Sequence, residues 1–193
     1  MNKLLLLTTA TLIATSSYAF EVKPYIEGKI SQNWMQAKYE HTSFKDQIFG
    51  GQVEVGAKLS QFRVGLEGYY NNTAEDKTPE HFPVKMESQG FFLNGYWDIP
   101  LGEPKNIKPF IGAGIGYSWL EGREDFSPNP LGKISFKDKD FGWNIALGVG
   151  YTLNDNLDLT LGYRYEDLGS IKKYSTKTDF TNHKLSLGVR YTF

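Results

Sequence analysis

The sequence predicts an all-β fold, an eight-stranded antiparallel up-and-down transmembrane β-barrel. Eight segments of nine to twelve residues alternate apolar residues with polar or small ones, and this period of two is typical of strands. The connections between these segments are short and long in turn, the layout of transmembrane barrels. One alternating set is apolar and free of charge, whereas the other carries charges and glycines. The last segment, KLSLGVRYTF at 184–193, needs a pairing partner for its edge, and we expect it to close the sheet against the first strand.

The first residues are expected to be removed rather than folded. Lys3 precedes an apolar core at 4–14, and Ser17-Tyr18-Ala19 forms a small-x-small cleavage site, as in secretory signal peptides. We therefore expect a signal peptide at 1–19 and one outer-membrane β-barrel domain at 20–193. The chain has no Cys, so neither disulfides nor a lipid-anchored cysteine are expected. With 21 Lys and Arg against 22 Asp and Glu, its charge gives no attraction to nucleic acid.

The first four strands are expected at 24–34, 51–59, 62–70 and 88–99. In the first, Ile26 and Ile30 alternate with Glu27 and Lys29. The second reads GQVEVGAKL and the third FRVGLEGYY, and both alternate without interruption. Ser60-Gln61 between them predicts a tight turn. The fourth, SQGFFLNGYWDI, places phenylalanines on both faces, and Pro100 follows its end.

The last four strands are expected at 109–120, 140–151, 157–167 and 184–193. The fifth and sixth set large apolar residues against glycines, which suits a crowded lumen. The seventh, LDLTLGYRYED, sets leucines and tyrosines against charges. The four remaining long segments are expected to be loops, at 33–50, 71–87, 121–139 and 168–179. The strand lengths are close to the ~9–11 residues that a tilted strand needs to cross a bilayer.

The apolar set is expected to face lipid and the charged set the lumen. A soluble barrel would have the opposite arrangement, but the apolar set is too large and continuous to be only a core. Two belts of aromatic residues near the strand ends favour the membrane. The belt on the short-turn side comprises Tyr25, Phe62, Trp97, Tyr151, Tyr191 and Phe193, and the belt toward the long loops comprises Tyr70, Phe91, Trp119, Phe141 and Tyr165.

Four segments resemble the outer-membrane β-barrel family of opacity-type surface proteins, which includes small barrels of the OmpA-transmembrane and OmpX type and rickettsial adhesins. They are GFFLNGYWDIP at 90–100, KPFIGAGIGYSWLEG at 108–122, LTLGYRYEDLG at 159–169 and the final LSLGVRYTF. The resemblance implies the outer membrane of a Gram-negative bacterium, with turns in the periplasm and loops outside. It also implies that Leu187, Val189, Tyr191 and Phe193 form the signal read by the barrel-assembly machinery. Outer-membrane lipid and lipopolysaccharide are the expected surroundings.

Both signs of charge occur on the lumen-facing set. The predicted interior charge network comprises Glu54, Lys58, Arg63, Glu67, Asp158, Arg164, Glu166 and Arg190, with Glu27, Lys29 and Lys184 on the same face. Buried charges must be paired, which favours a structural network that fills the lumen. An ion or solute pathway is the alternative.

No catalytic, cofactor-binding or metal-binding residue is predicted, and we expect no enzyme. His183 and Ser186 are three apart and face opposite sides of a strand, whereas His41 and His81 lie in expected loops. The GAGIG of 112–116 is interpreted as strand packing. In the expected loops, Trp34, Met35, Tyr39, Phe44 and Phe49 add apolar groups, and Lys172, Lys173 and Lys177 add positive charge. We expect a structural, adhesive or host-interaction role through these loops; the alternatives are a small porin-like channel and an outer-membrane lipid-modifying hydrolase.

Overall fold

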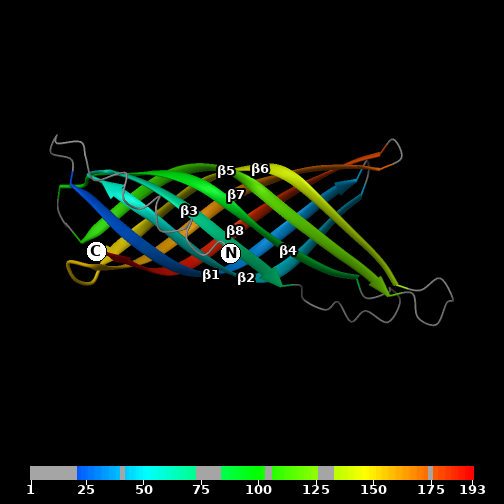
Figure 1. Ribbon diagram of the computed structural model, residues 1–193, viewed down its shortest axis with the longest axis horizontal. Helices are drawn as coiled ribbons and strands as arrows, with labels where there is room; N and C mark the ends of the chain where they lie inside the picture. Colours follow the sequence, from blue (N-terminus) through cyan, green and yellow to red (C-terminus); the bar gives the residue numbers. More distant parts are fainter. Residues whose placement is uncertain (1–20, 40–41, 73–83, 103–105, 126–132, 174–175) are drawn as a thin grey trace, which may run out of the picture.

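The computed structural model describes residues 21–39, 42–72, 84–102, 106–125, 133–173 and 176–193. Its strands close into one antiparallel barrel in chain order (Figure 1), which confirms the predicted fold class. The strands are β1 (Val22–Tyr39), β2 (Thr42–Leu59), β3 (Phe62–Asn72), β4 (Val84–Asp98), β5 (Ile107–Asp125), β6 (Lys133–Thr152), β7 (Leu157–Lys173) and β8 (Thr176–Thr192). No helix in these described ranges is long and apolar enough to cross a membrane.

The barrel closes between its first and last strands, as the sequence predicts. β1 and β8 pair from Tyr25↔Thr192 to Lys38↔Asp179, and the Phe193 N–H donates a hydrogen bond to the Pro24 carbonyl at 2.9 Å. A line of paired residues that leaves β1 at Tyr25 and passes through every strand returns to β1 at Met35, ten residues further along. This stagger tilts the strands against the barrel axis.

The predicted loop boundaries are wrong, because strands extend into every expected loop and make up most of 33–50, 121–139 and 168–179. Within expected loop 33–50, β1 extends to Tyr39 and β2 begins at Thr42. Within expected loop 168–179, all residues except 174–175 belong to β7 or β8. β3 and β4 extend into expected loop 71–87, and β5 and β6 extend into expected loop 121–139, whereas 73–83 and 126–132 lie outside the described residues. Polar and apolar residues do not alternate in these stretches, yet the backbone pairing between neighbouring strands continues through them. Alternation is needed only where the two faces of a sheet meet different surroundings.

The faces are as the alternation predicts, but one residue of the predicted aromatic belts is wrong. Outward side chains such as Leu66, Ile115 and Leu147 are about half exposed, whereas inward Glu54, Glu67 and Phe92 are fully buried. Tyr25 does not belong to the lipid-facing belt: its side chain points inward and is only 2% exposed. Tyr25 is two residues from Glu27 and therefore lies on the same, inward face of β1. The alternation of the strand thus outweighs the general preference of tyrosine for membrane interfaces.

The two faces of β8 provide a test. We expect a cysteine replacing Leu187, which is 54% exposed on the outer wall, to react with a lipid-phase thiol probe in proteoliposomes. A cysteine replacing Ser186 should stay unlabelled, because the Ser186 hydroxyl points inward and donates to the Gly162 carbonyl at 3.3 Å. Serine and cysteine are close in size, so this control disturbs the lumen little. Equal labelling of the two variants would contradict the assignment of faces.

Candidate functional site

The barrel interior is the part of the molecule where charged and polar side chains converge, and inward glycines make room for them. A Cβ at Gly112 would lie 2.4 Å from a carbon of the Tyr96 ring, and one at Gly148 would lie 2.4 Å from the Phe110 ring. The two rings therefore lie directly over glycine backbone and extend into the lumen, where they meet edge to face with centroids 5.8 Å apart. Side chains at these glycines would displace the rings.

Six charged side chains form an unbroken chain of alternating sign across the middle of the lumen. Lys29 Nζ lies 3.1 Å from Glu54 and 2.8 Å from Glu67. Arg164 contacts Glu67 through both terminal nitrogens and lies 3.5 Å from Glu166. Lys184 completes the chain, with its Nζ 2.7 Å from Glu166. We call this set the central chain.

The contact between Glu67 and Arg164 spans the barrel. Glu67 is on β3 and Arg164 on β7, four strands apart in a ring of eight and 97 residues apart in sequence. Both guanidinium nitrogens meet the carboxylate, and such paired hydrogen bonds are the strong form of this interaction. Glu67 is fully buried, so its pairing with Arg164 and Lys29 is what makes its charge tolerable there.

Neutral donors satisfy the remaining oxygens of the central chain. Glu54 accepts hydrogen bonds from the hydroxyls of Tyr25 at 2.5 Å and Tyr96 at 2.8 Å, and from the Asn94 amide at 3.2 Å. Glu166 accepts one from the Asn182 amide at 2.8 Å. Phenol and amide groups therefore hold the carboxylates in place together with the cations.

Two smaller ionic clusters lie toward the short-turn end. Asp98 binds Arg63 at 2.9 Å and Lys58 at 3.4 Å. The Arg63 guanidinium also lies over the Tyr96 ring, 4.5 Å from its centroid, in a cation–π geometry.

The second of these clusters is centred on Asp158. This carboxylate binds Arg190 at 2.9 Å and Lys108 at 3.5 Å. Glu27 lies between this cluster and the central chain and accepts a hydrogen bond from the Thr160 hydroxyl at 2.6 Å. The short-turn end thus also holds paired charges, which join strands that are adjacent or separated by one other strand.

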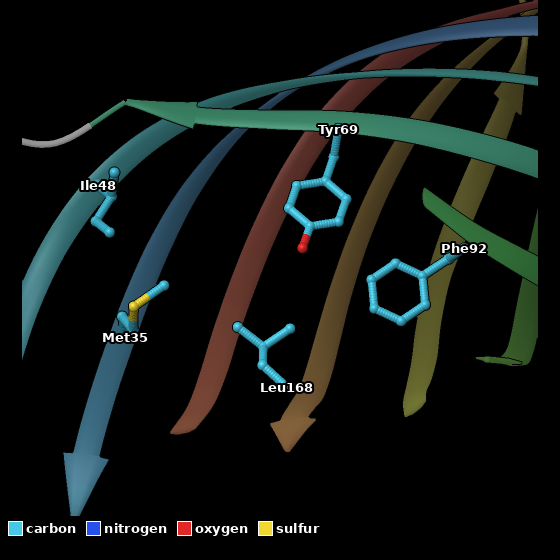
Figure 2. Packing of buried hydrophobic residues seen from close by; sticks show 5 residues of the cluster. All are labelled: Met35, Ile48, Tyr69, Phe92 and Leu168. Atoms are coloured by element: carbon cyan, nitrogen blue, oxygen red, sulfur yellow. The ribbon is translucent and has the colours of Figure 1, made fainter. Parts of the chain in front are cut away.

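Toward the long-connection end, an apolar cluster follows the charges. Its members are Met35, Ile48, Tyr69, Phe92 and Leu168 (Figure 2). Tyr69 and Leu168 are the inward residues that come directly after Glu67 and Glu166 on their strands, so the cluster lies one layer beyond the central chain. The Tyr69 and Phe92 rings stack with centroids 5.7 Å apart.

All eight residues predicted for the interior network face inward, and they fall into different groups. Glu54, Glu67, Arg164 and Glu166 join the central chain, whereas Lys58, Arg63, Asp158 and Arg190 belong to the short-turn clusters. The prediction omitted Asp98, although the alternation of 88–99 places it on the inward face. It also omitted Lys108, which lies one residue before the expected strand.

The residues predicted for other roles are spread over the molecule. His183 is on the outer wall, where its Nδ1 and the Tyr163 hydroxyl are 2.6 Å apart; it faces away from Ser186, as predicted. Leu187, Val189, Tyr191 and Phe193 are exposed on the outer wall. Trp34 and Met35 lie in β1 and Phe49 in β2, where its side chain faces outward. His41, His81 and the side chains of Tyr39, Phe44, Lys172, Lys173 and Lys177 lie outside the described part of the chain.

The interior offers no grouping suited to a metal. Across the described ranges, no three His, Asp or Glu side chains gather so that they could hold an ion. The carboxylates are instead separated by the cations of the central chain and of the two short-turn clusters.

Comparisons with known proteins agree with this architecture. The family described as "Outer membrane protein beta-barrel domain" matches residues 4–193. Outer membrane protein PagN of Salmonella typhimurium is 24% identical over 76% of this chain and 73% of its own length. Opacity protein opA67 of Neisseria gonorrhoeae is 26% identical over 66% of this chain, which spans 62% of that protein.

Solved structures share the fold. Neisserial surface protein A superposes with a TM-score of 0.66 at 20% identity, over 90% of this chain and 99% of that one. Ail of Yersinia pestis superposes with a TM-score of 0.54 at 14% identity, over the same shares of the two chains. The family match covers nearly all of the sequence and the described strands close as those barrels do, so the chain belongs to the outer membrane protein β-barrel domain family, as an opacity-type eight-stranded barrel of a Gram-negative outer membrane.

Proposed function

We propose that this outer-membrane protein is a non-conducting, non-enzymatic barrel that anchors a surface for adhesion or host interaction, and that its interior charge network is structural. The observation that carries the proposal is the central chain. Its six side chains contact one another in sequence, from Glu54 on β2 to Lys184 on β8. A barrel blocked at its middle contributes to function through what it presents outside, not through what it transports.

Three features support a filled lumen. An eight-stranded barrel is only just wide enough for side chains to fill it. The Glu67–Arg164 contact joins opposite walls, and the apolar cluster lies across the lumen beyond it. A small cavity beside Glu27, Arg63 and Arg164 measures about 20 Å³, room for a single water molecule.

The surface role rests on the long-connection end and on the relatives. β5 and β6 remain paired up to Asp125↔Lys133, and β4 and β5 up to Val84↔Glu124, so these three strands extend together well beyond the last β6–β7 pair at Trp143↔Asp167. Ail is by name an attachment invasion locus protein and has been crystallised with the heparin analogue sucrose octasulfate. We extend an adhesive role to this chain and expect host surface molecules to meet its long connections.

The proposal includes how the chain reaches the membrane. Residues 1–19 would act as the export signal and 20–193 as the barrel domain. Leu187, Val189, Tyr191 and Phe193 would present the assembly signal to the barrel-insertion machinery. In β8 these four side chains lie on the outer face of the strand. They would therefore offer one apolar face to a receptor before the barrel closes.

Conductance separates this reading from a porin. We expect refolded protein in planar bilayers to give no steady large single-channel currents, because the lumen is crossed by paired charges. Steady currents in every preparation would favour the small solute channel and overturn the filled lumen.

Incubation with lipid A followed by mass spectrometry tests the remaining alternative, since release of acyl chains would identify a lipid hydrolase.

The structural role of the central chain can be measured by a double-mutant cycle. We expect Glu67→Gln alone to lower the free energy of unfolding by about 3–5 kcal/mol, because it leaves Arg164 and Lys29 buried with one carboxylate fewer. Glu67→Gln combined with Arg164→Met should recover part of that loss. Urea unfolding in lipid vesicles provides the free energies. Asp155→Asn, at an exposed short turn, is the control and should change stability by less than about 0.5 kcal/mol. Additive effects at Glu67 and Arg164 would speak against a coupled pair.

The adhesive role can be tested by replacing the longest connections. Substituting 73–83 or 126–132 with a short glycine-serine linker leaves every described strand intact. We expect at least one replacement to reduce the binding of cells that display the barrel to host cells and matrix proteins. Heat-modified gel mobility should show that barrel assembly is unchanged. Replacement of the short turn at 154–155 is the matched control. Undiminished binding in both long-connection variants would leave 40–41 and 174–175 to be replaced together, and binding that survived this too would overturn the proposal.

A further inference from the structure

The outer wall carries a hollow of about 1110 Å³ whose floor is glycine backbone. Gly28 on β1, Gly51 on β2 and Gly68 on β3 all face outward within it. A Cβ built on Gly28 or Gly68 would meet no atom within 4 Å, and one on Gly51 would meet only a carbonyl oxygen at 3.9 Å. Large side chains such as Leu66 and Leu93 occupy neighbouring outward positions. The three glycines therefore form a local dent in an otherwise apolar surface.

The hollow runs diagonally up the wall. It follows the paired row Leu187, Ile30, Gly51, Tyr70, Gln89 and Trp119, from β8 to β5. Five steps of about 4.8 Å between strands give it a length of roughly 24 Å. Leu187 is five residues from the short-turn end of β8, and Trp119 is twelve residues from the short-turn end of β5. The row thus climbs from the periplasmic side toward the extracellular side.

The upper end of the hollow is polar. Gln89 is exposed on the outer wall, flanked through its strand pairing by Tyr70 and Trp119. Its amide has no hydrogen-bond partner among the residues that the structure describes. Tyrosine and tryptophan mark the boundary between acyl chains and headgroups, so Gln89 lies where a lipid offers carbonyl and hydroxyl groups. The Gln89 amide can both donate a hydrogen bond to such a group and accept one from it.

We propose that this hollow seats one acyl chain of lipid A, the outer-leaflet lipid, with the ester or amide linkage of that chain hydrogen-bonded to Gln89. An open, largely apolar hollow about 24 Å long, with Gln89 near its headgroup end between Tyr70 and Trp119, is long enough to hold an acyl chain and its linkage. Lipid A is the occupant because the polar end lies at the extracellular boundary, and lipopolysaccharide forms that leaflet. A second copy of the barrel fits poorly, since a two-fold contact would place one concave surface against another and leave a void.

Filling the dent tests the site. The variant Gly28→Leu/Gly68→Leu adds side chains where nothing obstructs them. Gly95→Leu makes the same change at an outward glycine of β4 outside the hollow, where a Cβ would come no closer than 4.0 Å to its neighbour. Gln89→Leu removes only the polar end. Each refolded protein is titrated with purified lipid A in detergent micelles and examined by native mass spectrometry, with heat-modified gel mobility to verify the fold.

We expect one lipid A to remain bound to the wild type and to Gly95→Leu under activation that strips it from the double variant. Gln89→Leu should weaken retention by about threefold to tenfold, as for one hydrogen bond in a membrane. Equal retention in all four proteins would reduce the lipid to ordinary surface coverage and overturn the proposal. Wild-type dimers lost in the double variant would overturn it in favour of a second copy.

Discussion

Every backbone N–H and C=O within a bilayer must find its partner inside the protein, and in this chain the pairing of β8 with β1 completes that requirement. Without the ladder from Tyr25↔Thr192 to Lys38↔Asp179, two open edges would face lipid. Closure also fixes the surroundings of each face, because one side of every strand must then meet acyl chains and the other an enclosed lumen. The alternation of the sequence is the chemical consequence of that geometry.

The enclosed lumen imposes a second requirement, since charges placed there have little water to screen them. The central chain meets it by alternating the sign of neighbouring groups, so that Lys29 and Arg164 each lie between two carboxylates. Removing an inner member would take one partner from each of its two oppositely charged neighbours, which makes the chain a coupled unit rather than a set of separate pairs. The contact between β3 and β7 is its widest span, and it braces opposite walls that share no backbone hydrogen bonds.

The sequence predicts the strands and their faces because alternation is a local property, visible within nine residues of β2 or β3. It does not predict that Glu67 meets Arg164, since that contact depends on the ten-residue stagger of the closed sheet and joins groups 97 positions apart. Tyr25 was misassigned because residue type was given more weight than its parity with Glu27. The extent of β1, β2, β5 and β6 was underestimated because the polar–apolar alternation ends before the paired strands do. In β1 and β2, for example, the inward residues Met35 and Ile48 are apolar.

Glycine has opposite consequences on the two faces of this barrel. At Gly112 and Gly148 the missing side chains admit the Tyr96 and Phe110 rings, which help to fill the lumen. At Gly28 and Gly68 no side chain takes the vacated space, and the wall is indented toward the membrane. Strand parity alone separates the two cases, since an inward glycine is crowded by residues from other strands and an outward one faces only lipid. The same residue type thus makes room for aromatic rings inside the barrel and indents its outer wall.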